Sequence, residues 1–105
     1  MGKCALTGYS DVRILVATHI KPWRDSTNSE RLDPYNGLLL LPNIDKAFAL
    51  GYITITEKGS IKKSEFIESP NVLCLQKKMK IKLVNNHQDY LAFHRENVFE
   101  KKFIE

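Results

Sequence analysis

The chain has 105 residues, of which 43% are hydrophobic and 27% are charged; this predicts a single globular domain with one modest core and excludes a disordered chain. No apolar run approaches the ~20 residues that cross a bilayer, and the first residues lack the pattern of a secretory signal, so we expect a cytoplasmic protein with no membrane partner. Sixteen Lys and Arg against twelve Asp and Glu give a net charge of +4, which is compatible with a polyanionic partner but does not require one.

The first predicted element is a strand over residues 12–20, which is rich in β-branched residues and ends before Lys21-Pro22. Pro22 has no amide donor and disfavours helix in the residue before it. Alternation along the strand puts Thr18 and His19 on opposite faces, close to its end.

A polar segment follows between Trp23 and Tyr35, and because it has little periodicity we expect a loop. Loops of this length are uncommon in compact domains unless they have a function. The run Asp33-Pro34-Tyr35-Asn36-Gly37 predicts a turn, because Asn and Gly tolerate positive φ. Residues 38–41 are four leucines, which predict a short buried strand that pairs back on the first.

A short helix is predicted over residues 44–50, preceded by Pro42-Asn43 and closed by Gly51. Helical spacing leaves Asp45 and Lys46 outside the face that would pack on the core. That face consists of Ile44, Ala47 and Phe48.

A β-hairpin is predicted next, because residues 52–56 alternate, residues 57–60 form a turn and Ile61 begins a returning strand. Residues 72–75 are a candidate further strand, and the basic segment 77–83 follows. Apolar positions then recur at spacings of three and four, which predicts a C-terminal helix packed on the β layer. Its stripe consists of Val84, His87, Leu91, His94 and Val98, with Tyr90 and Phe99 beside it.

Cys4 and Cys74 are far apart, and neither belongs to a C-x-x-C pair. A structural zinc site needs four converging ligands, so we do not expect one here. In a cytosolic chain both cysteines are most simply reduced, buried thiols.

Four separated motifs determine the functional reading. They are Cys4-Ala5-Leu6-Thr7-Gly8, Thr18-His19-Ile20-Lys21-Pro22-Trp23, Glu30-Arg31-Leu32-Asp33-Pro34-Tyr35-Asn36-Gly37-Leu38-Leu39-Leu40 and Asp45-Lys46-Ala47-Phe48. Their content and order resemble one branch of the HNH endonucleases, and the likeness continues into the hairpin and the closing helix. The resemblance implies an α+β fold in a single domain over residues 1–105. That fold is a ββα-metal (His-Me) finger with an added β-hairpin and a C-terminal helix.

The resemblance also implies metal-assisted hydrolysis of phosphodiester bonds in DNA. His19 matches the histidine that acts as the general base, a role that suits imidazole near pH 7. Asn36 matches the asparagine that is counted with that histidine among the catalytic residues and that mainly braces the loop around it. Asp45 matches the metal ligand on the helix, where a carboxylate favours a hard ion, Mg²⁺ or Mn²⁺, over zinc. The alternative for Asp45 is a first-turn carboxylate that complements the helix dipole. The ion would stabilise the leaving 3′ oxygen.

Two departures from the family pattern concern the metal site. Thr18 stands where the wider family often has Asp or His as a second ligand, and a hydroxyl is a weak ligand. Asp33 is our candidate to complete the shell, and Asp25 is a poorer one. The Phe-Asp-x-Gly that often follows the helix ligand reads Phe48-Ala49-Leu50-Gly51 here. If the missing carboxylate is needed for catalysis, this copy is impaired.

Several basic residues near the motifs are expected to contact DNA phosphates. They are Lys21, Arg24, Arg31, Lys46 and Arg95. The lysines of segment 77–83 are most simply a solvated face. Trp23 is expected in the core rather than as a base-stacking platform, and His87 and His94 as satisfied core histidines, with a phosphate contact as the alternative for His94-Arg95.

The expected function is therefore that of a metal-dependent HNH endonuclease of the restriction or defence type. The alternative is a catalytically decayed finger that only binds DNA, which Thr18 and Ala49 favour; a plain interaction domain is a third reading. In the resembling proteins a helical segment, and often a recognition domain, precedes the Cys-x-x-Thr-Gly block. The chain is thus either a minimal protein or the C-terminal part of a longer nuclease, and its sequence does not indicate an oligomeric state.

Overall fold

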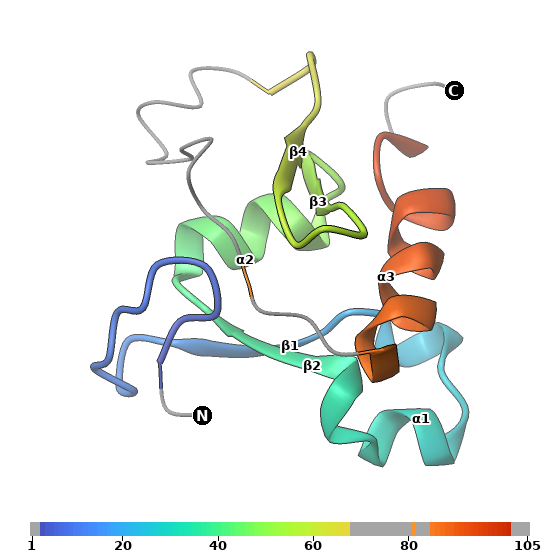
Figure 1. The fold of residues 1–105 in the computed structure, drawn as a ribbon, viewed down its shortest axis with the longest axis horizontal. Coiled ribbons are helices and arrows are strands. Elements are labelled where there is room, and N and C mark those ends of the chain that lie inside the picture. The colour runs from blue at the N-terminus through green and yellow to red at the C-terminus, as the bar shows by residue number, and fades with distance from the viewer. Residues whose placement is uncertain (1–2, 68–80, 82–84, 102–105) are drawn as a thin grey trace.

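The computed structural model describes residues 3–67, 81 and 85–101, which form two small antiparallel β-ribbons and the helices around them (Figure 1). The elements in chain order are β1 (Val16–His19), the 3-10 helix η1 (Trp23–Asp25), α1 (Asn28–Leu32), the 3-10 helix η2 (Pro34–Asn36), β2 (Gly37–Leu40), α2 (Pro42–Ala49), β3 (Ile53–Ile55), β4 (Ile61–Lys63) and α3 (Asn85–Asn97). The predicted α+β class and the strand–strand–helix order of the finger are confirmed.

The first ribbon pairs β1 with β2, so that Thr18 lies opposite Leu38 and His19 opposite Gly37. β1 begins at Val16, four residues later than predicted. The preceding residues turn instead of extending, because the amide of Ile14 donates to the carbonyl of Asp11 at 3.0 Å. The paired part of the strand is therefore the part that positions His19.

The connection between β1 and β2 is folded, and the prediction of a plain loop there is wrong. Helix α1 has a capping box: the Thr27 hydroxyl accepts from the Glu30 amide at 3.2 Å, and the Glu30 carboxylate accepts from the Thr27 amide at 2.8 Å. This Thr-x-x-Glu spacing is a helix-start signature that the sequence does contain. Asp33 and Pro34 end the helix, because the residue before proline disfavours helical φ and ψ.

The turn predicted at residues 33–37 is confirmed, but the reason given for it is wrong. Asp33 caps η2 by accepting from the Tyr35 amide at 2.9 Å. Gly37 is extended at φ −136°, and within the described residues the only non-glycine positive φ belongs to Glu100. The turn is therefore set by an aspartate cap and proline rather than by left-handed backbone.

Helix α2 begins at Pro42, buries the predicted face of Ile44, Ala47 and Phe48, and ends before Gly51. Gly51 is at φ +83°, where a side chain is strained, and an added Cβ would lie 2.3 Å from the Val98 carbonyl oxygen. Glycine here lets the chain after α3 pack directly against the end of α2.

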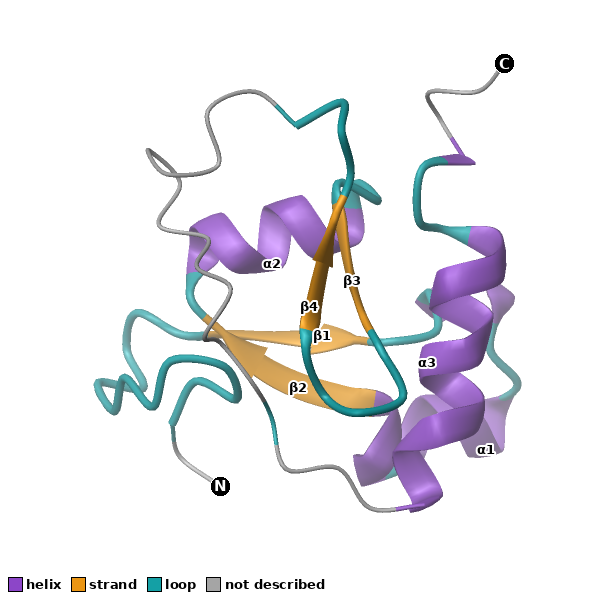
Figure 2. Cartoon of the chain, turned by 45° about the horizontal axis from the view of Figure 1, so that its top comes forward, coloured by secondary structure: helices purple, strands orange, loops and turns teal. Residues whose placement is uncertain are grey.

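The second ribbon is the predicted hairpin, with Ile53 opposite Lys63 and Ile55 opposite Ile61. Figure 2 shows it beside α2, with α3 along its other side. The core between these elements consists mainly of fully buried aliphatic and aromatic side chains, namely Ile20, Leu40, Ile44, Phe48, Ile53, Ile55 and Leu91. Cys4 is a free, buried thiol, as predicted.

Some predictions fall on residues outside the described ones: the strand at 72–75, Cys74, and all of the basic segment 77–83 except Ile81. In the described part of the chain, no helix is long and apolar enough to cross a membrane.

Candidate active site

His19 ends β1 and is half buried. Its Nε2 lies 3.0 Å from the carbonyl oxygen of Arg31. Because a carbonyl only accepts, Nε2 carries the proton of this bond, and Nδ1 of the neutral ring is the nitrogen left with a free lone pair. The backbone of α1 therefore fixes both the orientation of the ring and the nitrogen that can act as a base.

A hollow of about 280 Å³ opens beside His19. It lies where the end of β1, the start of η1, the last turn of α2 and helix α3 meet. The side chains important here are Thr18, His19, Trp23, Phe48, Ala49 and His94. We refer to this space as the His19 hollow.

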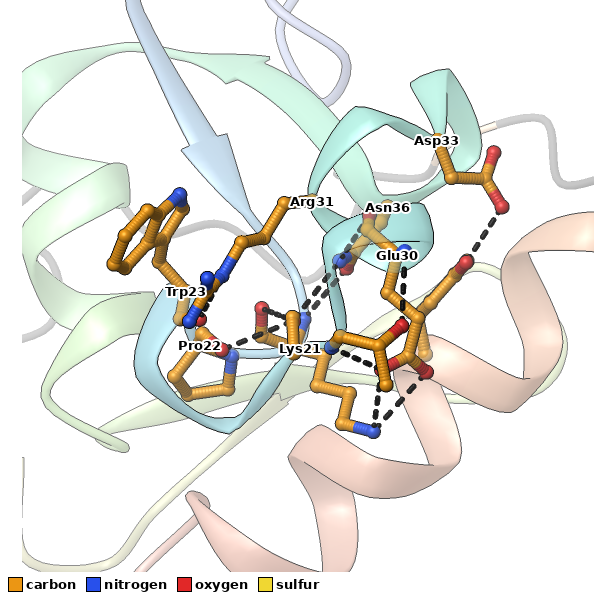
Figure 3. A network of polar contacts seen from close by, with 10 residues as sticks. Lys21, Pro22, Trp23, Glu30, Arg31, Asp33 and Asn36 are labelled. Carbon is orange, nitrogen blue, oxygen red and sulfur yellow. Dashed lines mark hydrogen bonds and ion pairs between the residues drawn. The ribbon is translucent and has the colours of Figure 1, made fainter.

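Asn36 is completely buried, and its side chain holds the connection in place (Figure 3). Its Oδ1 accepts from the Lys21 amide at 2.8 Å, and its Nδ2 donates to the Glu30 carbonyl at 3.1 Å and to the Ser26 hydroxyl at 3.3 Å. These bonds join the residues just after His19 to the helix whose carbonyl holds His19. That geometry agrees with the predicted bracing role, while a direct catalytic role for Asn36 stays a prediction.

Asp45 stands in the first turn of α2 and is half buried. Residues four apart share a helix face, so Asp45 lies one turn from Ala49, which lines the His19 hollow. Among the carboxylates of residues 16–49, all of which are described, Asp45 alone has no ion pair or side-chain hydrogen bond. Its oxygens are free to bind a ligand.

Asp33 has structural contacts through both of its carboxylate oxygens. Its Oδ1 caps η2 and its Oδ2 accepts from the Tyr90 hydroxyl at 2.5 Å. The bond from Tyr90 is the main reason why the pKa of Asp33 is lowered, and the same bond raises the pKa of Tyr90 to about 12. One oxygen thus caps η2 and the other fastens α3 to the finger, so both are engaged within the described structure, and a role of Asp33 as a metal ligand stays a prediction.

The remaining predicted ligands, Thr18 and Asp25, differ in their position relative to the His19 hollow. Asp25 is near Arg24, at 3.9 Å from its Nε, and does not line the His19 hollow. Thr18 does line it. No group of three His, Cys, Asp or Glu side chains in the described ranges could hold a metal ion. Of the predicted ligands, Thr18 therefore lines the hollow, and Asp45 lies one helical turn from Ala49, which lines it.

Two of the residues predicted to contact DNA have partners within the described structure, and their contact with DNA stays a prediction. Lys21 donates through Nζ to both oxygens of Glu30, at 3.0 and 3.1 Å, and Arg95 donates to the Ile55 carbonyl at 2.8 Å. Their charged groups stabilise the fold around the site. Arg24 and Lys46 are exposed, and their contact with DNA stays a prediction.

Trp23 is 59% exposed, so the prediction that it belongs to the core is wrong. The guanidinium carbon of Arg31 lies 3.6 Å from the centroid of its ring system, and Arg31 Nε donates to the Trp23 carbonyl at 2.9 Å. The sequence shows an aromatic residue after proline, and nothing in that pattern indicates on which side η1 will present the ring.

His94 is 1% exposed and ties three elements together. Its Nε2 donates to the Phe48 carbonyl at 2.8 Å, its Nδ1 accepts from the Thr54 hydroxyl at 2.7 Å, and its ring stacks on Phe48 with the centroids 3.7 Å apart. Thr54 is buried on β3 for this reason, although simple alternation would expose it. The reading of His94 as a satisfied core histidine agrees with these contacts, and a phosphate contact does not. His87 packs edge-on against Tyr35.

Burial lowers the pKa of His94 to about 4, from an ordinary value of 6.5. Between these values the unfolded chain binds a proton that the folded chain does not, so stability should fall as the pH is lowered through this window. From pH 7 to pH 5 we expect a loss of about 2 kcal/mol in the free energy of unfolding. Urea denaturation at the two pH values measures it. In His94→Gln the free energy of unfolding lost between pH 7 and pH 5 should be smaller. An unchanged loss would show that His94 is not its source.

Comparison with known proteins agrees with this geometry. A family model described as HNH endonuclease matches residues 4–56, from Cys4 through both strands of the first ribbon, α2 and β3. The match covers half of the chain, and the chain belongs to the HNH endonuclease family.

A solved structure named a modification dependent TagI restriction endonuclease has a similar fold. Its TM-score is 0.58 at 19% sequence identity, and the match covers 92% of this chain but 33% of that one. The chain thus spans about a third of the length of that structure. No curated protein matches this chain.

Proposed function

We propose that this domain hydrolyses phosphodiester bonds of DNA with a divalent ion, as the cutting part of a cytoplasmic restriction or defence nuclease. The observation that carries the proposal is the state of His19. Its Nε2 is held by the Arg31 carbonyl, which leaves Nδ1 as the basic nitrogen of a histidine that lines the hollow. Membership of the HNH endonuclease family supports the reaction class.

In this mechanism His19 Nδ1 accepts a proton from water as the oxygen attacks phosphorus, and the 3′ oxygen leaves. The Arg31 carbonyl keeps its bond to Nε2–H throughout and stabilises the imidazolium that forms. Asn36 bonds both to the residue after the Ile20 that follows β1 and to α1, and so holds α1 where the Arg31 carbonyl can bond to His19 Nε2. The protonated ring can then return its proton to solvent.

The donor set fits a hard ion such as Mg²⁺ or Mn²⁺. Mg²⁺ is commonly held by one or two carboxylates, with water and substrate phosphate oxygens completing its shell. Asp45 would supply the carboxylate and Thr18 a weaker hydroxyl ligand. Such an ion supplies stabilisation of the negative charge on the leaving oxygen and the phosphate.

A decayed finger that binds DNA without cutting it is the second candidate. Ala49 favours it, because this residue lines the His19 hollow at the position where the family pattern often has an aspartate. A binding module would show salt-dependent affinity for DNA, with no dependence on divalent ions.

A plasmid-nicking assay separates the two candidates. Supercoiled plasmid should be nicked in Mg²⁺ or Mn²⁺ and left intact in EDTA, because without the ion the leaving oxygen loses its stabilisation. The assay should also include Ni²⁺, because the affinity of a carboxylate site does not by itself select one divalent metal ion over another. Intact plasmid with every ion, together with retained DNA binding, would favour the decayed finger.

A further inference from the structure

Trp23 is the only tryptophan of the chain, and its indole is left largely exposed at the edge of the His19 hollow. An indole is the largest apolar side chain available to a core, and this chain has only a modest one. Its exposure beside the candidate general base is therefore a feature that core packing does not explain.

The ring is held rigidly rather than left free. Trp23 is the first residue of η1, and the Arg31 guanidinium covers one of its faces, with the guanidinium carbon 3.6 Å from the ring centroid. Arg31 is fixed in turn by bonds from Nε to the Trp23 carbonyl and from Nη1 to Asn28 Oδ1, at 2.9 and 3.3 Å. Figure 3 shows the two side chains lying together. We call this pair the Trp23–Arg31 plate.

The plate carries a positive charge that no carboxylate balances within the described residues. Both hydrogen-bond partners of the Arg31 guanidinium among the described residues are neutral oxygens. The nearby cations differ, since Lys21 is paired with Glu30 and Arg24 lies close to Asp25. Arg31 is also the residue whose carbonyl holds His19, so the plate and the general base share one backbone segment.

We propose that the Trp23–Arg31 plate positions the DNA strand for cleavage, with the remaining donors of Arg31 on a phosphate and the open indole face against the adjoining base. A guanidinium is well matched to phosphate, and stacking on an indole tolerates any base. The inference rests on the proposed function and adds a substrate-positioning role for Trp23 to it.

The fluorescence of the chain tests the contact directly, because all tryptophan emission comes from position 23. The His19→Ala chain in EDTA is titrated with DNA of about 12 nucleotides, as single strand and as duplex. Binding is followed in parallel by the anisotropy of a dye on the DNA. Quenching that saturates together with the anisotropy supports the plate. Binding without any change in emission overturns it, and so does the absence of binding.

Kinetics of plasmid nicking test the positioning role separately from chemistry. Trp23→Ala should raise KM by about tenfold, the loss of one stacked base, and leave kcat within about twofold. Trp23→Phe should have a KM close to that of the wild type, because a phenyl ring also stacks on a base. Phe66→Ala is the matched control, because Phe66 is also an exposed aromatic but does not line the His19 hollow.

The two arms distinguish failure of this inference from failure of the proposed function. If wild-type protein nicks plasmid and Trp23→Ala has an unchanged KM, the plate is wrong and the nuclease activity stands. If nothing is nicked with any ion but the emission is quenched by DNA, the nuclease activity is wrong and the plate stands as a DNA contact.

Discussion

Replacing His19 by alanine should abolish detectable plasmid nicking while leaving the domain folded and able to bind DNA. The side chain is half buried at the end of β1, and its only hydrogen bond within the described residues is to the Arg31 carbonyl. Loss of a positioned general base costs about 10²–10⁴ in rate. Nicking rates at saturating Mg²⁺ measure the effect.

The control for this variant is His87→Ala, which removes a histidine that packs on Tyr35 outside the hollow. Circular dichroism and the urea midpoint should be recorded for both proteins, because nicking lost through unfolding would say nothing about the base. A folded His19→Ala protein that nicks at the wild-type rate would show that His19 is not the base. A His87→Ala protein as inactive as His19→Ala would point to a general loss of structure.

The elements of this fold that could be predicted are those with local signals. A β-branched run stopped by Pro22, a leucine run after Gly37, a helix between Pro42 and Gly51, and a hairpin were each visible in a short window of sequence. The family motifs then gave the order of strands and helix. Helix α1 was missed although its Thr27–Glu30 capping box is also a local signal, because the segment has no apolar periodicity.

The partners of the polar side chains could not be predicted, because they come from distant parts of the chain. Asp33 resembles a spare ligand in sequence, but Tyr90 on α3 takes its second oxygen. Thr54 resembles an exposed strand residue, but His94 meets it from α3. Tertiary contacts, which no local pattern encodes, therefore decide which charges of the finger are satisfied and which remain free.

The charged side chains of the finger differ in whether they are paired within the fold. Glu30 and Asp33 are engaged in the structure of the finger, while Asp45, one helical turn from the hollow-lining Ala49, is left without a partner among the described residues. Lys21 is neutralised, while Arg31 is not. The unpaired carboxylate and the unpaired guanidinium are suited to a cation and a phosphate respectively, as a metal-assisted nuclease requires.

Replacing Asp45 by asparagine should lower the nicking rate by about a hundredfold or more, because Lewis-acid stabilisation of the leaving group is worth several kcal/mol. The change removes a charge and keeps the shape, and Asp45 has no partner in the described structure whose loss would unfold the helix. The deficit should narrow as the concentration of Mg²⁺ is raised, since the defect is one of ion binding. DNA affinity in EDTA should be kept.

Asp89→Asn is the matched control, since it removes an exposed carboxylate from α3 and should leave nicking unchanged. A carboxylate supplied by Ala49→Asp in the Asp45→Asn background should recover part of the rate, because position 49 is one helical turn from position 45 and lines the His19 hollow. A nicking rate unchanged by Asp45→Asn would show that Asp45 is not a metal ligand. A nicking rate restored by Ala49→Asp would locate the ion at the face of α2 that carries positions 45 and 49. An indirect effect of Asp45→Asn on stability would not be corrected by a carboxylate at position 49.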